Sequence, residues 1–223
     1  MRFAGTTLLV VALLGWSVAD VGAQAVTDRY DTLFRSYSKK FFGPAFDWRI
    51  FKAQAMAESN LNPNAKSWVG ARGLMQLMPA TYKEVRSKNP ELGEISDPKW
   101  NIAAGIFYDR QLWRLWTELG EDVEHRRNFM FGSYNAGRGT LLRAQDVAEN
   151  KALNANEWPS IKSVAPDVPR WRHEETLGYV EKISANVEVM DENGRVTRAA
   201  TARRPTGADT GTPPKSAGVP PPK

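Results

Sequence analysis

Residues 58–79 constrain the fold of this chain more than any other stretch, because they end one helix and open another. Glu58 follows an apolar segment of helical periodicity, and Asn60, Pro63 and Gly70 prevent that helix from continuing. We therefore expect Glu58 on the last turn of a helix, where the negative end of the helix dipole raises the pKa of a carboxyl group. A single Glu is most often a solvated surface residue, but this placement suits a proton donor.

Apolar residues recur at helical spacing along most of the chain, and Gly, Pro, Asn and Asp separate the segments. No stretch alternates with the period of a strand, and the sequence has no internal repeat. The pattern predicts an all-α body of roughly seven helices over about 165 residues. The predicted helices are 30–41, 47–58, one that begins at Pro79, 97–119, 122–134, one that begins at Thr140, and 174–190; residues 150–172, with Pro159, Pro166 and Pro169, are expected to be mostly loop.

The net charge of +5 is confined to the C-terminal end of the sequence. Residues 194–223 hold six basic residues and one acidic residue, residues 1–25 are neutral, and residues 26–193 therefore carry no net charge. The body lacks the basic surface of a nucleic-acid-binding domain, so we expect no nucleic-acid partner. The tail is rich in Pro, Gly, Thr and Ala, which predicts disorder. Its charge also allows a weak contact with a membrane or an anionic polymer.

Residues 1–25 have the pattern of a secretory signal peptide. Arg2 precedes the apolar run 8–14, and Ala23 and Ala25 form a small-x-small cleavage site. The run is shorter than the roughly 20 residues that span a bilayer, and an uncleaved anchor is the alternative. The predicted organisation is a signal peptide (1–25), a helical domain (26–193) and a disordered, basic, proline-rich tail (194–223). The absence of cysteine excludes a disulfide scaffold, a thiolate metal site and a lipid anchor on cysteine.

Residues 58–79 resemble the first motif of the lytic transglycosylases related to the soluble type, a family with a goose-type-lysozyme-like fold (the SLT domain). The family pattern has Glu-Ser, a Pro, Ala-x-Ser and then Gly-Ala-x-Gly-Leu-Met-Gln-Leu-Met-Pro, and every element is present at the family's spacing. Gly132-Ser133 and Leu177 depart from the family, which has Ala-Ala before its Tyr-Asn and often Arg after its Thr. Three further matches follow in the family's order, within about residues 48–186: Asn101-Ile102 with Gly105, Tyr134-Asn135-Ala136-Gly137, and Glu175-Thr176-x-x-Tyr179-Val180.

The resemblance implies roles for eight residues. Glu58 would be the catalytic acid and then the base, and Tyr179 would lie beside it and orient it. Glu175 and Tyr179 are four positions apart and so share one helix face, and the amides of Gln76 and Asn135 offer donors and acceptors to sugar groups. Taken singly, each residue has an ordinary structural explanation, so the joint pattern carries the prediction. The residues that would line the saccharide groove are Ser67, Gln76, Met78, Tyr134, Asn135 and Glu175.

The resemblance also implies the reaction. A hydrolytic glycosidase normally uses two carboxyl groups, whereas the motif supplies only Glu58. The family's reaction cleaves the MurNAc–GlcNAc bond of peptidoglycan without water and leaves a 1,6-anhydro-MurNAc end. We expect this activity here, with no cofactor and no metal, since the sequence has no His-Glu-x-x-His or similar cluster.

Two alternatives stay open. One is a peptidoglycan hydrolase (a lysozyme) of the same fold, and the other is a non-catalytic wall-binding or secretion accessory protein. The expected substrate is the peptidoglycan glycan strand, and the signal peptide implies secretion to the periplasm of a bacterial cell envelope. An association with cell-wall or secretion machinery is compatible with each of these functions.

Overall fold

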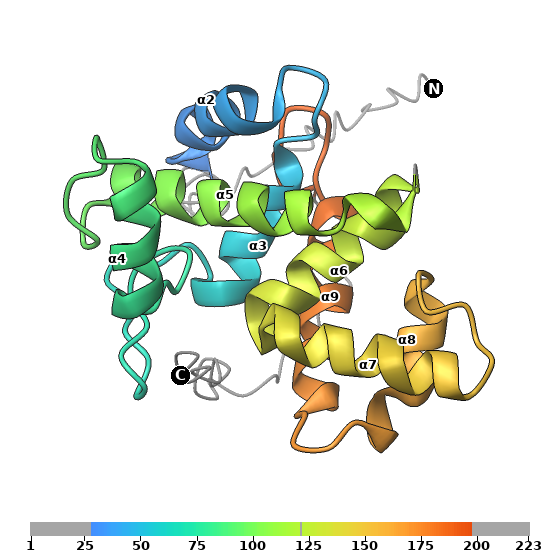
Figure 1. Cartoon of the computed structure of the whole chain (residues 1–223). Coiled ribbons are helices and arrows are strands. Elements are labelled where there is room, and N and C mark those ends of the chain that lie inside the picture. The colour runs from blue at the N-terminus through green and yellow to red at the C-terminus, as the bar shows by residue number, and fades with distance from the viewer. Residues whose placement is uncertain (1–27, 121, 198–223) are drawn as a thin grey trace, which may run out of the picture.

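The computed structural model describes residues 28–120 and 122–197, which form helices joined by loops (Figure 1). Within this part of the chain there is no β-strand, only three isolated bridges, so the predicted all-α class is confirmed. The elements are α2 (Asp31–Phe42), α3 (Arg49–Ser59), α4 (Pro79–Lys88), α5 (Pro98–Leu115), the 3-10 turn η1 (Thr117–Leu119), α6 (Val123–Ala136), α7 (Arg138–Asn150), α8 (Trp158–Val164), the 3-10 turn η2 (Ala165–Asp167) and α9 (His173–Glu188).

Helix α5 crosses the centre of the molecule in Figure 1. Helix α2 packs against α5, α3 packs against α9, and α6 contacts α5, α7 and α9. The apolar side chains of these helices form one contiguous core, which includes Phe34, Phe51, Ile102, Ile106 and Phe129. Helix α3 is buried along almost its whole length, so even its polar side chains face the interior of the protein.

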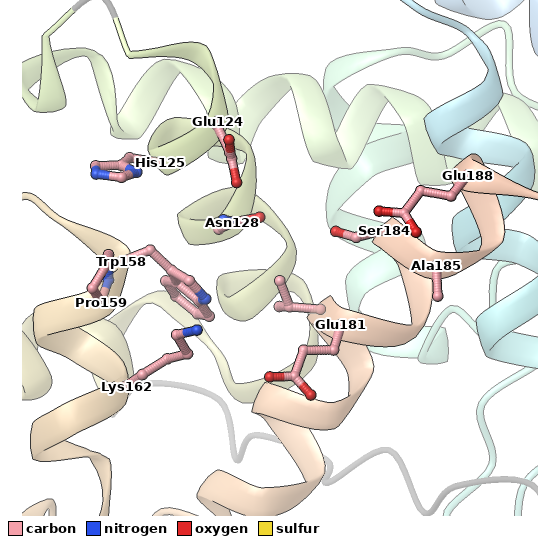
Figure 2. Close-up of a pocket in the computed structure, with 11 residues that line it drawn as sticks. Glu124, His125, Asn128, Trp158, Pro159, Lys162, Glu181, Ser184, Ala185 and Glu188 are labelled. Carbon is pink, nitrogen blue, oxygen red and sulfur yellow. The ribbon is translucent and has the colours of Figure 1, made fainter.

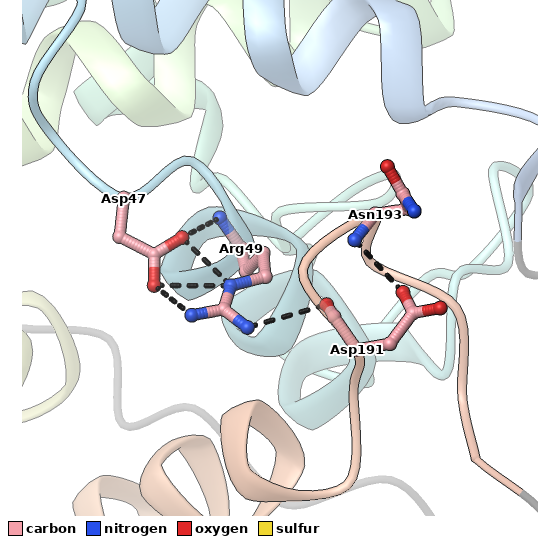
Figure 3. Close-up of polar contacts among 4 residues, drawn as sticks. All are labelled: Asp47, Arg49, Asp191 and Asn193. Atoms are coloured by element: carbon pink, nitrogen blue, oxygen red, sulfur yellow. Dashed lines mark hydrogen bonds and ion pairs between the residues drawn. The ribbon is translucent and has the colours of Figure 1, made fainter.

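The predicted helix starts use the residues that the sequence indicated. Asp97 and Asp122 each accept a hydrogen bond from a backbone N–H in the helix that follows them, and Pro79 occupies the first turn of α4. The carboxylate of Asp47 accepts from the backbone N–H of Arg49, the first residue of α3, and also forms an ion pair with its guanidinium (Figure 3). These contacts satisfy N–H groups that have no partner inside a helix.

One helix boundary predicted from the sequence is wrong, and one helix was not predicted. Helix α5 ends at Leu115 rather than at Leu119, because the chain tightens into η1 before it reaches Gly120. Residues 150–172, expected to be mostly loop, also contain α8 and η2. Pro159 sits in the first turn of α8, where a missing N–H costs no hydrogen bond. It therefore starts a helix at the position where we expected it to prevent one.

The chain turns back after α9 onto the start of α3 (Figure 3). The side chain of Asp191 accepts from the backbone N–H of Asn193, and its carbonyl oxygen accepts from the guanidinium of Arg49. The backbone N–H of Thr197 donates to the carbonyl of Val189 at 2.8 Å. The described chain thus stays in contact with the helices for four residues beyond residue 193, where we expected the domain to end.

The predicted signal peptide (1–25) and the predicted tail from residue 198 onward lie outside the described residues. In the helices of residues 28–120 and 122–197, none combines the length and the apolar character needed to cross a membrane.

Candidate active site

Glu58 lies on the last turn of α3, as the sequence predicts, and is only 7% exposed. The helix ends directly after it, because Asn60 adopts a left-handed conformation with φ of 52°. The hydroxyl of Tyr179, on α9, donates a hydrogen bond of 2.6 Å to Oε1 of Glu58. Two residues that are 121 positions apart in the sequence are therefore joined by the packing of α3 against α9.

The electrostatic surroundings of Glu58 favour its neutral form. Burial is the largest influence, and it raises the pKa of Glu58 to about 8. The negative charge of Glu175 adds to this rise, while the hydrogen bond from Tyr179 and the positive charge of Lys182 oppose it. The net effect is a carboxylic acid that keeps its proton at neutral pH and can donate it.

An open pocket lies over Glu58, and the loop after α3, the start of α4, α5 and α6 all contribute to it. Five of the predicted site residues meet there: Glu58, Gln76, Met78, Tyr134 and Asn135. Glu58 provides the one carboxyl group in this lining. The remaining lining residues are Leu77, Ala80, Thr81, Tyr108, Ser133 and Gly137.

The loop that carries Gln76 is held in an unusual conformation. Gln76 has a φ of 43°, and its side-chain Nε2 donates to the carbonyls of Gly73 at 2.9 Å and Ala65 at 3.2 Å. Gly73 has a φ of 77°, and a Cβ at this position would lie 2.4 Å from Nδ2 of Asn101. Asn101 in turn accepts from the backbone N–H of Met75 at 2.8 Å. The glycine of the motif thus admits the asparagine that fixes the loop.

Tyr134 and Asn135, at the end of α6, are also fixed by hydrogen bonds. The hydroxyl of Tyr134 donates to the carbonyl of Met75 at 2.7 Å. Oδ1 of Asn135 accepts from the hydroxyl of Thr176 at 2.8 Å, and that hydroxyl accepts from the indole N–H of Trp171 at 3.0 Å. Because the oxygen of Asn135 is used within the protein, its N–H donors are the part that can serve a ligand.

Three predicted site residues do not line the pocket. Tyr179 lies behind it and contacts Glu58, as described above. Glu175 lies one turn before Tyr179 on α9, with an oxygen 2.6 Å from the guanidinium of Arg172. Ser67 is buried in the loop after α3, where its hydroxyl oxygen accepts from the backbone N–H of Ala71 at 2.9 Å. The visible contact of Ser67 is thus one that shapes the loop.

Sequence reasoning missed two residues beside Glu58. The ring of Tyr108 lines the pocket with its centroid 5.3 Å from that of Tyr134. It lies seven positions after Asn101, and this two-turn spacing on one helix face could have revealed it. Lys182 lies one turn beyond Tyr179 on α9 and donates to the carbonyl of Ala57. Its charge near Glu58 could have been inferred from the same spacing.

A second pocket lies between α6, α8 and α9 and contains none of the predicted site residues. Figure 2 shows Glu124 and Asn128 from α6, Trp158 and Lys162 from α8, and Glu181 from α9 around it. No group of three or more His, Asp or Glu side chains in the described part of the chain could hold a metal ion. Five of the eight predicted site residues line the pocket of Glu58, and none of the eight lines the second pocket.

Comparison with known proteins agrees with the motifs. A family model described as the Transglycosylase SLT domain matches residues 37–157. The Membrane-bound lytic murein transglycosylase F of Shewanella pealeana is 34% identical over 152 residues, which is 68% of this chain and 29% of that protein. The protein of the same name from Desulfosudis oleivorans is 30% identical over 162 residues, which is 68% of this chain and 34% of that protein. The chain thus spans about a third of the length of these relatives.

Comparison with solved structures also identifies a lytic transglycosylase fold. The 70 kDa soluble lytic transglycosylase from Escherichia coli superposes with a TM-score of 0.54 and 26% identity, over 77% of this chain and 26% of that one. A complex of the 70-kDa soluble lytic transglycosylase with bulgecin A superposes with a TM-score of 0.56 and 24% identity, over 78% and 27%. The predicted lysozyme-like helical fold is confirmed by these matches. The chain belongs to the transglycosylase SLT domain family.

Proposed function

We propose that this protein is a peptidoglycan lytic transglycosylase that cleaves the MurNAc–GlcNAc bond and leaves 1,6-anhydro-MurNAc ends. The observation that carries the proposal is the single carboxyl group of the pocket. Glu58 is buried, protonated at neutral pH and held by Tyr179, and no second carboxylate in the pocket lining is available to activate water. The relatives named lytic murein transglycosylase support the same substrate and reaction.

One carboxyl group is enough because it acts twice. Glu58 donates its proton to the bridging oxygen as the bond from C1 to that oxygen breaks. The acetamido group of the substrate stabilises the positive charge that develops at C1. The Glu58 carboxylate then takes the proton of the C6 hydroxyl of the same sugar, whose oxygen forms the new bond to C1. Glu58 ends protonated, as it began, and no water is consumed.

Tyr179 has a defined part in this cycle. Its hydroxyl donates to Oε1 of Glu58, which leaves Oε2 as the oxygen that carries and returns the proton. The same hydrogen bond stabilises the carboxylate form, since it lowers the pKa of Glu58 against the effect of burial. Tyr179 therefore orients the acid and stabilises its ionised form between the two proton transfers.

The other predicted residues would bind the glycan strand. The Nε2 donors of Gln76 are used by the loop, so its Oε1 would accept from a hydroxyl or an acetamido N–H. Asn135 has the opposite arrangement, and its N–H donors would serve a sugar oxygen. Met78 and the ring of Tyr134 would provide apolar contacts in the pocket. Glu175 and Ser67 lie outside this lining, and we propose that they contact the strand beside the pocket, where the charge of Glu175 also acts on Glu58.

A peptidoglycan substrate implies that the enzyme acts in the bacterial cell envelope. Peptidoglycan is the partner that the family relationship supports, and residues 1–25 would direct the protein to the periplasm. The basic residues of 194–223 would give it a weak affinity for membranes or anionic wall polymers. An association with wall or secretion machinery would place the same activity at one site of the wall.

The products of digestion test the proposal. Residues 26–223 are incubated with purified peptidoglycan, and the released muropeptides are analysed by mass spectrometry. We expect products one water lighter than hydrolytic ones, with activity lost in Glu58→Gln. Glu181→Gln, the same change in the second pocket, is the matched control and should remain active.

Two other results would each support an alternative function. Reducing-end products would indicate a hydrolase and require a water-activating carboxylate. Glycan binding without any release, by a folded protein, would indicate a wall-binding accessory protein.

A further inference from the structure

A second carboxyl group is buried behind the proposed acid and takes no part in the reaction described above. Asp109, near the middle of α5, has no exposed surface. Tyr108, its neighbour in the sequence, lines the pocket. The negative charge of Asp109 raises the pKa of Tyr134 and of Tyr179. A buried carboxyl group at such a position is costly unless its bonding is complete or its proton is kept.

The hydrogen-bond partner of Asp109 is on the helix of Glu58. Gln54 lies one turn before Glu58 on α3, and its Nε2 is 3.4 Å from Oδ1 of Asp109. One atom of each side chain is left over, because Oε1 of Gln54 and Oδ2 of Asp109 are both buried without a hydrogen-bond partner among the described residues. In the ionised form both leftover atoms are acceptors, and neither can satisfy the other.

A proton on Asp109 changes this result. A protonated Oδ2 becomes a donor, and Oε1 of Gln54 is the unused acceptor of the same pair. The carboxylic acid and the amide can then exchange two hydrogen bonds, one in each direction. Protonation of Asp109 therefore satisfies both buried atoms at once.

The charge of Glu58, from α3, also favours the neutral form of Asp109. The other titratable groups that respond to the charge of Asp109 are Tyr108 from α5, Tyr134 from α6 and Tyr179 from α9, and none of them is a base. In the described part of the chain Asp109 forms no ion pair with a basic side chain. Burial, and then the charge of Glu58, raise the pKa of Asp109 well above its usual range, while the bond from Gln54 opposes them.

We propose that Asp109 is a positioning residue: as a neutral carboxylic acid it forms a reciprocal pair with the amide of Gln54 and so fixes the rotation of α3 that aims Glu58 into the pocket. The proposal rests on the proposed role of Glu58. A neutral Asp109 lets Glu58 lose and regain its proton without a second negative charge nearby. An acid held neutral to donate a hydrogen bond is a known solution in enzyme sites.

Two substitutions of Asp109 test whether the residue acts as a neutral acid or as a charged carboxylate. Asp109→Asn keeps the pairing, because its amide donates where the acid hydroxyl donated and accepts where Oδ1 accepted. Asp109→Leu has a similar volume but leaves the amide of Gln54 unpaired. We expect Asp109→Leu to lower kcat about tenfold or more with little change in KM, as a misplaced acid does. We expect Asp109→Asn to restore kcat to within about twofold of the wild type.

A double variant separates positioning from stability. Gln54→Leu with Asp109→Leu removes both polar partners, which is close to neutral for folding. We expect it to regain the unfolding midpoint of the wild type in urea and still to have the low kcat of Asp109→Leu. If the double variant regains both the unfolding midpoint and the kcat of the wild type, the pair has only a structural role and the proposal is overturned.

Unfolding also tests the proton directly, without any enzymatic activity. A raised pKa in the folded state means that the folded protein holds a proton that the unfolded chain releases, so the wild type loses stability as pH rises above the usual Asp range. Asp109→Asn should have a shallower decline across that range. At neutral pH the wild type should show infrared absorption from two protonated carboxylic acids, Asp109 and Glu58, and Asp109→Asn should show that of Glu58 alone. A decline as steep as that of the wild type, or a loss of kcat in Asp109→Asn comparable to that of Asp109→Leu, would show that the charged form is used.

The two proposals can fail separately. An active Glu58→Gln would overturn the role of Glu58, and the unfolding data would still decide whether Asp109 carries its proton. If Glu58→Gln is inactive and Asp109→Asn is as impaired as Asp109→Leu, the proposed function is supported. The proposal that Asp109 acts as a neutral acid would then be wrong.

Discussion

The two ends of helix α3 bury ionisable groups in opposite ways. Near its start, Lys52 has no exposed surface, and its Nζ lies 2.7 Å from Asp31 and 3.3 Å from Asp28 and donates to the carbonyl of Gly194 at 2.8 Å. At its end, Glu58 receives one hydrogen bond from a neutral hydroxyl and forms no ion pair among the described residues. The first group is compensated by charged and polar partners, and the second is compensated by keeping its proton.

The difference shows what distinguishes a structural buried charge from a reactive one. A charge surrounded by fixed partners contributes to a single folded state, and removal of one partner leaves the others uncompensated. A carboxyl group with few partners has a shifted pKa, costs stability when it ionises, and is ready to transfer a proton. The partners around each end of α3 therefore predict opposite results for substitution.

The largest effect on stability is expected for Lys52→Met. It leaves the partly buried Asp31 without its cation, and we expect a loss of about 3–5 kcal/mol in the free energy of unfolding. Urea unfolding near neutral pH measures it. Lys40→Met is the matched control, because Lys40 pairs with Glu91 where both side chains are about half exposed, and it should cost less than about 1 kcal/mol. Equal losses would mean that the burial of Lys52 has no special cost.

The next effect has the opposite sign. Glu58→Gln should stabilise the protein by about 2–4 kcal/mol near pH 8, while it removes activity. The pKa of Glu58 is about 8 in the folded state against 4.5 as a free group, so its contribution to stability is greatest below about pH 4.5 and falls as pH rises toward 8. The gain from the substitution should therefore shrink toward zero in urea unfolding near pH 4. A gain that is constant with pH would contradict a buried neutral Glu58.

A smaller effect tests the packing beside Lys52. A Cβ on Gly194 would lie 2.2 Å from the ring of Trp48, at a φ of 81°. We expect Gly194→Ala to cost about 1–3 kcal/mol more than Gly70→Ala in thermal or urea unfolding. Gly70 is the control because it also ends a turn with a positive φ of 94°, but a Cβ there would meet nothing within 4 Å. Similar losses would mean that Trp48 moves aside without cost.

The smallest effect concerns the pH dependence of activity. The hydrogen bond from Tyr179 lowers the pKa of Glu58, so Tyr179→Phe should raise that pKa. Because the reaction needs protonated Glu58, kcat/KM of the wild type should decline above about pH 8, and the decline should begin at higher pH in Tyr179→Phe. A hydrogen bond of this kind contributes about 0.5–1.5 kcal/mol. A decline that moves to lower pH would show that Tyr179 does not stabilise the carboxylate.

Local patterns predicted the elements and much of the pocket. The caps Asp97 and Asp122 and the early proline of α4 are signals within one turn of the helix that they start. The first and third motifs supplied the five predicted lining residues, because they mark the end of α3, the start of α4 and the end of α6, and these helix ends meet at the pocket of Glu58. Asp109 could also have been found, since it lies on the inward face of α5 with Ile102 and Ile106.

Other features depend on contacts between distant parts of the chain. Lys52 gave no sign of burial in the sequence, because its partners come from residues before and in α2 and from Gly194, which is 142 residues away. Helix α8 starts at Trp158, whose ring packs against that of Phe129, and Pro159 by itself cannot indicate this contact. Sequence periodicity indicates neither the burial of Lys52 nor the start of α8, because both depend on tertiary packing.

The bond between Lys52 and Gly194 has a consequence for the order in which the protein can be completed. A ribosome delivers the N-terminal helices first, and α3 is present long before Gly194 has emerged. Until then Lys52 would have to enter the core without one of its three partners. The missing hydrogen bond, to the carbonyl of Gly194, joins residues that are 142 positions apart in the sequence. We therefore expect the protein to become resistant to protease only after residue 194 has emerged, so that its activity would appear late in synthesis.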